Sequence, residues 1–449
     1  MYFVYSLLMG LAALLLLPYW LIQGLRHGKY LSNLSERLGF SFPSLSKLPA
    51  DRAGAIWIHA VSVGEVLSGV ALARSLKQAY PERPLIVSTT TMTGQALARQ
   101  RLPFADAVIY FPLDWAFCVR RALRAVQPAV VVVLETEIWP NFLREAGRRK
   151  TPVIFVSGRI SDRSFVRYQS YFGKFGFFLR PFLRSALGHA SAFLMQSQND
   201  ADRIRALGAP SGIVSVSGNM KYDQALPAPT PLSNWLEAEV RRRGRHPVIV
   251  AGSVVAGEEE AVLGAYDTVQ RQWRRTLFIL APRKPDRFDF VARLVAEGGW
   301  HVIRRSEIDL SKPLDENADV LILDSIGELA ALYALADATF VGGSLVASGG
   351  HNILEPAQFG RPPVFGPHME NFKQMAEAFL DAKAGAQVTS GNALGTVWMQ
   401  LIQNTEMREH VGAAAKALAE SNRGATARTL EKIEAVLAPI ALPAKDATQ

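Results

Sequence analysis

The sequence predicts an α/β protein with two doubly wound domains, each built on a parallel sheet that helices cover on both faces. Three observations support this fold class. Short apolar runs alternate with longer amphipathic stretches, as buried parallel strands alternate with surface helices. A proline-rich segment interrupts the alternation near the middle, and the same pattern restarts after it. The length of 449 residues is enough for two large domains.

The composition excludes several classes of protein. With 49% hydrophobic and 20% charged residues, the chain is neither disordered nor a polytopic membrane protein. Its single cysteine, Cys118, excludes an intramolecular disulfide and a cysteine-ligated zinc site, and we expect this side chain to be buried. The net charge of +9 favours anionic partners such as phosphates or acidic lipids, without specifically indicating nucleic acid.

The first predicted element is a membrane anchor helix over residues 1–29. Residues 3–25 carry no charge and, as a helix, are long enough to cross a hydrocarbon core of about 30 Å. Arg26 and Lys29 follow the apolar run, whereas a signal peptide carries its positive charges in front of it, so we expect the flank after the anchor to face the cytoplasm. Pro18 leaves a second arrangement open, in which the segment lies in the interface.

The first doubly wound domain is expected over residues 30–225. Segment 67–80 is typical of the helices between its strands. The apolar runs that predict the strands are 55–62, 84–90, 107–113, 129–137, 152–157, 192–197 and 213–218.

The second domain is expected over residues 247–437, after a linker at 226–246 and before a frayed tail at 438–449. An alternative that the sequence leaves open is that the last helix of this domain packs back on the first domain. The strands are predicted at 247–253, 277–283, 300–305, 319–325, 338–344 and 362–367. Two such domains face each other across a cleft, and ligands of parallel sheets bind beyond the carboxyl ends of the strands, so polar residues that follow a strand are candidate site residues.

The segment IHAVSVGEV places Glu65 in the first turn of the helix after the first strand. A glutamate is favoured there on structural grounds alone, because it faces the positive end of the helix dipole. The functional interpretation is a general base at the cleft. The same dipole would keep it ionised at neutral pH, ready to take a proton from an attacking alcohol.

Two further candidates in the first domain also follow strands. In VVVVLETEIWPN, Glu135 lies near the strand end and is expected to point into the cleft, whereas Glu137 has a competing interpretation as a cap of the next turn. Lys221, in SGNMKYD, can neutralise an anionic leaving group or a donor carboxylate, and a solvated lysine fits this position equally well.

The second domain offers a basic loop and a glycine-rich loop. Arg283, in APRKPDR, can bind a phosphate bidentately, with a merely basic loop as the alternative. In FVGGSLVASGGHNILEPA, paired glycines lead to a helix expected to begin at His351 or Asn352, whose N-terminus is a natural phosphate site. Glu355 lies about one turn further, where it can accept hydrogen bonds from ribose hydroxyls. Gly327 and Glu328 lie at another strand-to-helix turn that faces the same cleft.

Familiar catalytic motifs are missing from the sequence. It contains no G-x-x-x-x-G-K-[ST], no H-E-x-x-H and no G-x-S-x-G, and its eight histidines lack ligand spacing, so no catalytic metal is expected. The segment 163–184, in contrast, is rich in aromatic and basic residues and has no acidic one. This composition favours a membrane-surface element, or a cradle for an amphiphile that bears phosphates, over a core helix with basic edges.

Together these motifs resemble the bacterial 3-deoxy-D-manno-octulosonic acid (Kdo) transferases. The resemblance rests on IHAVSVGEV, ETEIWPN, APRKPDR, GELAALYALAD and FVGGSLVASGGHNILEPA, and it covers nearly the whole chain. It implies the GT-B fold, two Rossmann-like domains across a cleft. It also implies a metal-independent, inverting transfer of Kdo from CMP-Kdo to the lipid A precursor (lipid IVA), in lipopolysaccharide biosynthesis at the cytoplasmic face of the inner membrane. No cofactor is implied beyond the donor.

The same resemblance implies a role for each matching residue. Glu65 is the proton acceptor, and Glu135 and Lys221 stabilise the transition state. The segments that bind CMP are represented by Pro282, Arg283, Ile326, Gly327, Glu328, Asn352, Ile353, Leu354 and Glu355.

The sequence departs from the family pattern at two positions. The family commonly has G-S-T-H where this chain has Gly252 to Val255, and A-P-R-H where it has Lys284 as the fourth residue. Both changes remove a histidine near the donor site. Lys284 keeps a positive charge there, whereas Val255 offers no polar group.

Three other functions stay open at this point. One is a GT-B transferase that uses a UDP-linked sugar, and another is a sugar-nucleotide epimerase, which would need neither a lipid acceptor nor an anchor. The third is a non-catalytic, membrane-bound sensor of sugar nucleotides, which would bind CMP without forming a product.

Overall fold

The computed structural model describes residues 1–27, 33–48 and 54–438, and for residues 17–27 it describes the backbone alone. The chain forms two compact units. Unit 1 comprises residues 1–224 together with the chain from 423 on, and unit 2 comprises residues 225–422. Residues 28–32 and the predicted tail from 439 on lie outside the described residues.

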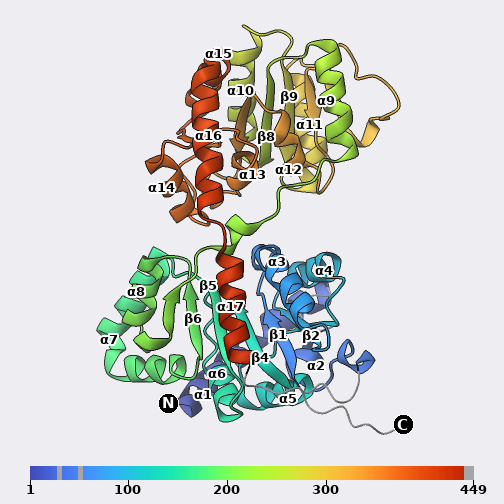
Figure 1. Cartoon of the computed structure of the whole chain (residues 1–449). Coiled ribbons are helices and arrows are strands. Elements are labelled where there is room, and N and C mark those ends of the chain that lie inside the picture. The colour runs from blue at the N-terminus through green and yellow to red at the C-terminus, as the bar shows by residue number, and fades with distance from the viewer. Residues whose placement is uncertain (28–32, 49–53, 439–449) are drawn as a thin grey trace. The chain divides into compact units, whose positions relative to one another are not determined.

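Unit 1 is a parallel sheet between two layers of helices (Figure 1), as the sequence predicts. Its strands have the order β3-β2-β1-β4-β5-β6-β7. They are β1 (Ala55–His59), β2 (Leu85–Thr89), β3 (Ala107–Tyr110), β4 (Pro128–Leu134), β5 (Val153–Gly158), β6 (Ala192–Met195) and β7 (Val214–Val216). The helices are α1 (Tyr2–His27), α2 (Leu34–Arg37), α3 (Val63–Ala79), α4 (Met92–Arg101), α5 (Ala116–Val126), α6 (Pro140–Arg148), α7 (Asp162–Leu187), α8 (Gln198–Ala206) and α17 (Ala425–Leu437), with short 3₁₀ turns η1 (Leu45–Lys47), η2 (Ser211–Ile213) and η3 (Met220–Asp223).

Unit 2 repeats this plan with the strand order β10-β11-β9-β8-β12-β13-β14. Its strands are β8 (Val248–Val254), β9 (Leu277–Pro282), β10 (Val302–Arg304), β11 (Val320–Ile322), β12 (Ala338–Val341), β13 (Val364–Phe365) and β14 (Ala386–Gln387). The helices are α9 (Pro231–Arg243), α10 (Glu259–Gln270), α11 (Phe288–Glu297), α12 (Leu329–Leu332), α13 (Leu354–Ala357), α14 (Lys373–Asp381), α15 (Gly391–Gln403) and α16 (Thr405–Ser421), and the 3₁₀ turns are η4 (Pro285–Arg287), η5 (Arg305–Glu307) and η6 (Tyr333–Leu335).

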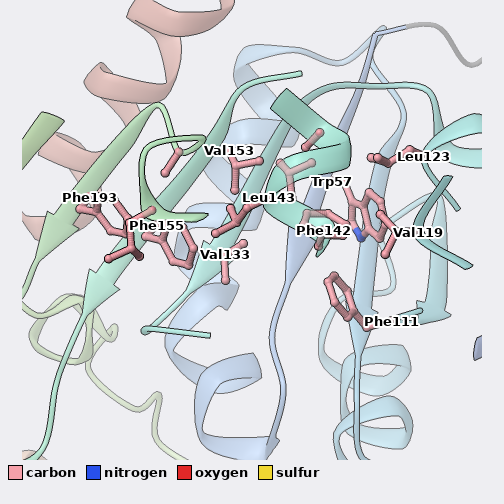
Figure 2. Close-up of a cluster of buried hydrophobic side chains, with 14 of the residues drawn as sticks. Trp57, Phe111, Val119, Leu123, Val133, Phe142, Leu143, Val153, Phe155 and Phe193 are labelled. Carbon is pink, nitrogen blue, oxygen red and sulfur yellow. The ribbon is translucent and has the colours of Figure 1, made fainter. Parts of the chain in front are cut away.

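The continuous apolar runs reflect strands that are buried on both faces. In β1, Trp57 points to the face covered by α5, α6, α7 and α8, whereas Ile56 and Ile58 point to the face covered by α3, α4 and α17. Figure 2 shows Trp57 beside Phe142 of α6, with the two ring centroids 5.4 Å apart. The Trp57 indole N–H donates to Ser88 Oγ of β2 at 2.8 Å, so its polar atom is satisfied inside this core.

Helix α17 belongs to unit 1 although the chain reaches it through unit 2. Ile433 and Leu437 are buried in the core cluster that α3 and α4 also cover. At the start of the helix, the Asp223 carboxylate accepts hydrogen bonds from the backbone N–H groups of Gly424, at 2.6 Å, and Thr426. This contact joins the two places where the chain passes between the units, because Asp223 precedes the first passage and Gly424 follows the second.

Helix α1 makes specific contacts with unit 1 through its first turns. The Tyr5 hydroxyl donates to Asp114 Oδ2 at 3.0 Å, and Asn141 Nδ2 donates to Ser6 Oγ at 3.0 Å. The membrane-spanning form of the anchor predicted over 1–29 finds no support here: among the described residues, no helix is both long enough and apolar enough to span a bilayer.

The predicted aromatic and basic segment forms most of α7. The helix is interrupted at Phe175, whose φ of −132° and ψ of 21° are not helical. Near this break, Phe175, Phe177 and Phe178 are all exposed, whereas Phe172 is buried in the core of unit 1, so the segment combines a core contact with an exposed aromatic stretch.

A buried carboxylate fixes the loops at the end of the second sheet. Glu258, in the loop after β8, is fully buried and accepts hydrogen bonds from the backbone N–H groups of Gly343, Ser344 and Leu345 at 2.7 to 2.8 Å. It also accepts one from Val255 at 3.0 Å. These bonds connect the loop after β8 to the glycine-rich loop after β12, because one acidic side chain satisfies donors from both.

We expect Glu258→Gln to destabilise unit 2 by at least about 2 kcal/mol, because the amide loses the charge and directs an N–H₂ group at backbone donors. Thermal unfolding of the full chain measures the change. The matched control is Glu260→Gln, since Glu260 is exposed. Equal unfolding temperatures for the two variants would contradict this account of Glu258.

Candidate active site

The first group of candidate residues lies at the carboxyl edge of the unit 1 sheet. Glu65 is in the first turn of α3, directly beyond β1, and is only 7% exposed. Its carboxylate accepts hydrogen bonds from the Val61 backbone N–H at 2.6 Å and from Ser62 Oγ at 3.2 Å. The structure therefore gives Glu65 the helix-start role that the sequence allows, and it also leaves the carboxylate at the edge where ligands of parallel sheets bind.

The expectation that the helix dipole keeps Glu65 ionised at neutral pH is wrong. Burial, together with the negative charges of Glu135 and Glu137, raises the pKa of Glu65 to about 8, against the opposing hydrogen bonds from Val61 and Ser62. Desolvation and two acidic neighbours outweigh the favourable N-terminal position. The result is a carboxyl group that is a stronger base than usual once it has lost its proton.

Glu135 and Lys221 lie together, as expected for residues that act on one ligand. Lys221 Nζ is 3.7 Å from Glu135 Oε1. Glu135 follows β4 directly and has a φ of +57°, in the left-handed region that a glutamate rarely adopts. Strained backbone of this kind is concentrated at functional sites. Since Glu135 also acts on the pKa of Glu65, the structure brings the three candidate residues of unit 1 into one cluster.

Glu137 is not the cap of the following helix. The N–H groups of Asn141 and Phe142, at the start of α6, donate instead to Asp114 at 3.0 and 2.8 Å. Burial raises the pKa of Glu137, and the Glu135 charge adds to this effect. Glu137 is therefore a further member of the acidic cluster, and its competing interpretation as a cap is wrong.

The candidates of unit 2 also share one edge, because β11, β9, β8 and β12 are successive strands of its sheet. Pro282 ends β9, and the exposed Arg283 follows it. Beyond β11, Ile326 is 83% exposed and Gly327 has a φ of +96°, which a residue with a side chain would rarely adopt. Glu328 is the N-cap residue directly before α12 and forms an ion pair with Arg305.

The segment after β12 differs from the expected helix N-terminus. Helix α13 begins at Leu354 and has only four residues, and Asn352 Oδ1 accepts from the Leu354 N–H at 3.2 Å. Ile353 and Leu354 are buried. Burial raises the pKa of Glu355 to about 7, with the Arg283 charge opposing the rise. Arg283 and Glu355 thus lie close enough to influence each other across the edge of the sheet.

Sequence reasoning missed two groups at this edge. Glu258 already binds the N–H groups of the Gly343–Leu345 turn, so those donors do not form an open phosphate site. Its place in a G-E-E-E run beside a strand end was the available signal. His351 has a buried Nε2 without a hydrogen-bond partner, and burial lowers its pKa to about 4, assisted by Arg283.

At the two departures from the family pattern, Val255 contributes its backbone N–H to Glu258, and Lys284 is exposed. Across the described ranges, no group of three or more histidine, cysteine or acidic residues is arranged to hold a metal ion.

Comparisons with known proteins relate this chain to one family of enzymes. Residues 32–224 match the family model described as 3-deoxy-D-manno-octulosonic-acid transferase (kdotransferase). The chain is 33% identical to the 3-deoxy-D-manno-octulosonic acid transferase of Haemophilus influenzae, over 97% of this chain and 98% of that protein. It is also 33% identical to the transferase of the same name from Bordetella pertussis, over 96% and 98% of the two chains.

Among solved structures, a putative UDP-N-acetylglucosamine 2-epimerase from Listeria monocytogenes superposes with a TM-score of 0.57 and 12% identity, over 87% of this chain and 98% of that one. At this identity the likeness concerns the fold, and it confirms the expected pair of parallel-sheet α/β domains. The sequence likeness, over nearly the full length of both relatives, shows that the chain belongs to the 3-deoxy-D-manno-octulosonic acid transferase family.

Proposed function

We propose that this protein transfers Kdo from CMP-Kdo to a hydroxyl group of the lipid A precursor, with inversion at the anomeric carbon and with no cofactor beyond the donor. The observation that carries the proposal is the full-length membership of the family, together with a buried carboxylate at the strand end where the family resemblance expects the base. The reaction requires the donor held by unit 2 to meet Glu65 of unit 1.

In the proposed reaction, Glu65 accepts the proton of the acceptor hydroxyl as its oxygen attacks the ketosidic carbon. The bond between that carbon and the phosphate oxygen breaks, and CMP leaves with the bonding electron pair. Positive charge develops on the sugar ring in the transition state, which the negative charge of Glu135 stabilises. Lys221 lies 3.7 Å from Glu135, where it can hold the carboxylate of the donor sugar.

Arg283 and the segment from Asn352 to Glu355 are assigned to the nucleotide. The guanidinium of Arg283 compensates the phosphate charge, and Glu355 accepts hydrogen bonds from the ribose. Binding of the phosphate beside Arg283 removes part of the charge that favours ionised Glu355, so the ribose hydroxyls have to supply the compensating hydrogen bonds.

The acceptor is proposed to be reached at the cytoplasmic face of the inner membrane, through residues 3–25 and 163–184. In α1, Phe3, Leu8 and Leu15 are exposed. In α7, the exposed Phe177 and Phe178 stand among basic residues without an acidic one, from Arg163 to Arg184. Aromatic side chains flanked by cations are suited to an anionic lipid surface.

We expect Glu65→Gln to reduce Kdo transfer by at least about a thousandfold, because the amide cannot take the proton. CMP binding should stay within about twofold of wild type, since Glu65 belongs to unit 1. The measurement is product mass after incubation with CMP-Kdo and the acylated acceptor, beside a calorimetric titration with CMP. Glu82→Gln, at an exposed position of unit 1, is the control. Retained turnover in the Glu65 variant would remove this residue from the mechanism.

We expect the rate of transfer to rise with pH through about 8, because the ionised form of Glu65 is the base and its pKa lies there. In Glu135→Gln this limb of the profile should move to lower pH, since loss of the neighbouring charge favours ionisation of Glu65. In Glu137→Gln the shift should be smaller, because its charge has the weaker effect. The measurement is the profile of kcat/KM against pH, which reports pKa values of the free enzyme, and a limb that stays in place in both variants would refute the assignment.

We expect the double substitution Phe177→Ser and Phe178→Ser to raise the KM for acceptor embedded in anionic vesicles by at least about tenfold. The reason is that the variant can no longer move two exposed aromatic rings from water into the lipid surface. The KM for acceptor dispersed in detergent should change little. Phe290→Ser, at a residue of unit 2 that is 40% exposed, is the control. An unchanged vesicle KM would separate α7 from lipid recognition.

A further inference from the structure

Arg305 and Glu328 form a planar pair at the edge of the unit 2 sheet where the donor is proposed to bind. Arg305 Nε is 2.9 Å from Glu328 Oε2, and Arg305 Nη2 is 3.2 Å from Oε1. This fork-to-fork geometry fixes both groups in one plane. Glu328 follows β11, the neighbour in the sheet of β9, which leads to Arg283. The pair therefore lies at the same edge as the group assigned to the phosphate.

Asp324 binds the residue before Arg305 and the residue after it. The carboxylate of Asp324, just beyond β11, accepts from Arg304 Nε at 2.9 Å, from the Ser306 N–H at 2.8 Å and from Ser306 Oγ at 2.6 Å. Because the residues before and after Arg305 are bound to the same side chain, the guanidinium has a defined position. A side chain that discriminates between ligands needs such a defined position, whereas a surface ion pair without a ligand does not.

The pair is also open to a ligand. The side chains of Arg305 and Glu328 are 21% and 17% exposed. Beside them, the apolar side chain of Ile326 is left in water. A Cβ atom placed on Gly327 would find no other atom within 4 Å, so the space next to this residue is empty. A flat ring can lie against Ile326 and Gly327 with its edge toward the ion pair.

The hydrogen-bonding capacity of the pair is not exhausted. A guanidinium has five N–H donors and a carboxylate can accept about four hydrogen bonds, and the contacts within the pair use two of each, beside one from Ser325 to Glu328. The remaining pattern is a donor next to an acceptor. Cytosine presents the complement, an N4 amino donor beside the N3 acceptor, whereas uracil presents an O4 acceptor beside an N3–H donor.

We propose that Arg305 and Glu328 read the base of the donor nucleotide and select cytosine over uracil. Glu328 accepts from the N4 amino group, and Arg305 donates to N3 or O2. This inference rests on the proposed function, because it assumes a cytidine donor, and it adds Arg305 as a specificity-determining residue. A mismatch of this kind sets two acceptors and two donors against each other, which corresponds to about ten- to hundredfold in affinity.

The test is the ratio of CMP to UMP affinity of the full chain, measured by calorimetry, alongside Kdo transfer from CMP-Kdo. Wild type should prefer CMP by tenfold or more. In Arg305→Gln the preference should fall to a few-fold, through loss of CMP affinity with UMP affinity little changed. In Glu328→Gln the side-chain amide can present a donor to O4 of uracil, so the preference should move toward UMP.

The matched control is Arg241→Gln, because Arg241 of α9 forms an ion pair with Glu237 and none with Glu328 or Asp324. Its CMP:UMP ratio should equal that of wild type. A general loss of packing would lower the unfolding temperature and both affinities together, and an unchanged ratio in Arg305→Gln and Glu328→Gln would overturn the inference. If wild type transfers Kdo from CMP-Kdo while both variants keep its ratio, the inference alone fails; if wild type shows no transfer and no preference for CMP, the proposed function fails with it.

Discussion

The parallel direction of every strand in both sheets is the constraint on which the candidate site depends. All carboxyl ends of a parallel sheet emerge at one edge, so residues far apart in sequence meet there without any dedicated scaffold. In unit 1 this brings Glu65, Glu135 and Lys221 together. In unit 2 it gathers the loops after β8, β9, β11 and β12. The same arrangement leaves acidic groups partly buried and close to one another. This crowding raises the pKa values of Glu65 and Glu137.

Most of the fold could be predicted from the sequence, because strands that are buried on both faces consist of continuous apolar runs, such as VVVVL before Glu135. The positions of the candidate residues follow from the same runs. The ionisation of these residues does not follow from the apolar runs, because it depends on distances between side chains on neighbouring strands. A dipole argument from the first turn of α3 gave the wrong sign for Glu65, since no local pattern shows that Glu135 and Glu137 act on it.

The edge of the unit 2 sheet where the donor is proposed to bind illustrates a second limit of prediction from sequence. The glycines between 342 and 350 indicate close backbone contacts, but they do not show which group makes those contacts. The N–H groups of Gly343, Ser344 and Leu345 donate to Glu258, a side chain 85 to 87 residues earlier in the chain. Likewise, the pairing of Arg305 with Glu328 crosses from one strand end to the next, and neither residue stands in a pattern that names the other. Contacts between loops are decided by the sheet order.

The place of α17 in unit 1 has a consequence for how the protein is made. The ribosome must finish unit 2 before it can supply the last element of unit 1, so nascent unit 1 waits with the surface that receives Ile433 and Leu437 uncovered. During that interval this apolar surface can attract chaperones or neighbouring chains. Completion of the first-made unit thereby requires that unit 2 be synthesised first, and chains that terminate before α17 are left with a defect that quality control can recognise.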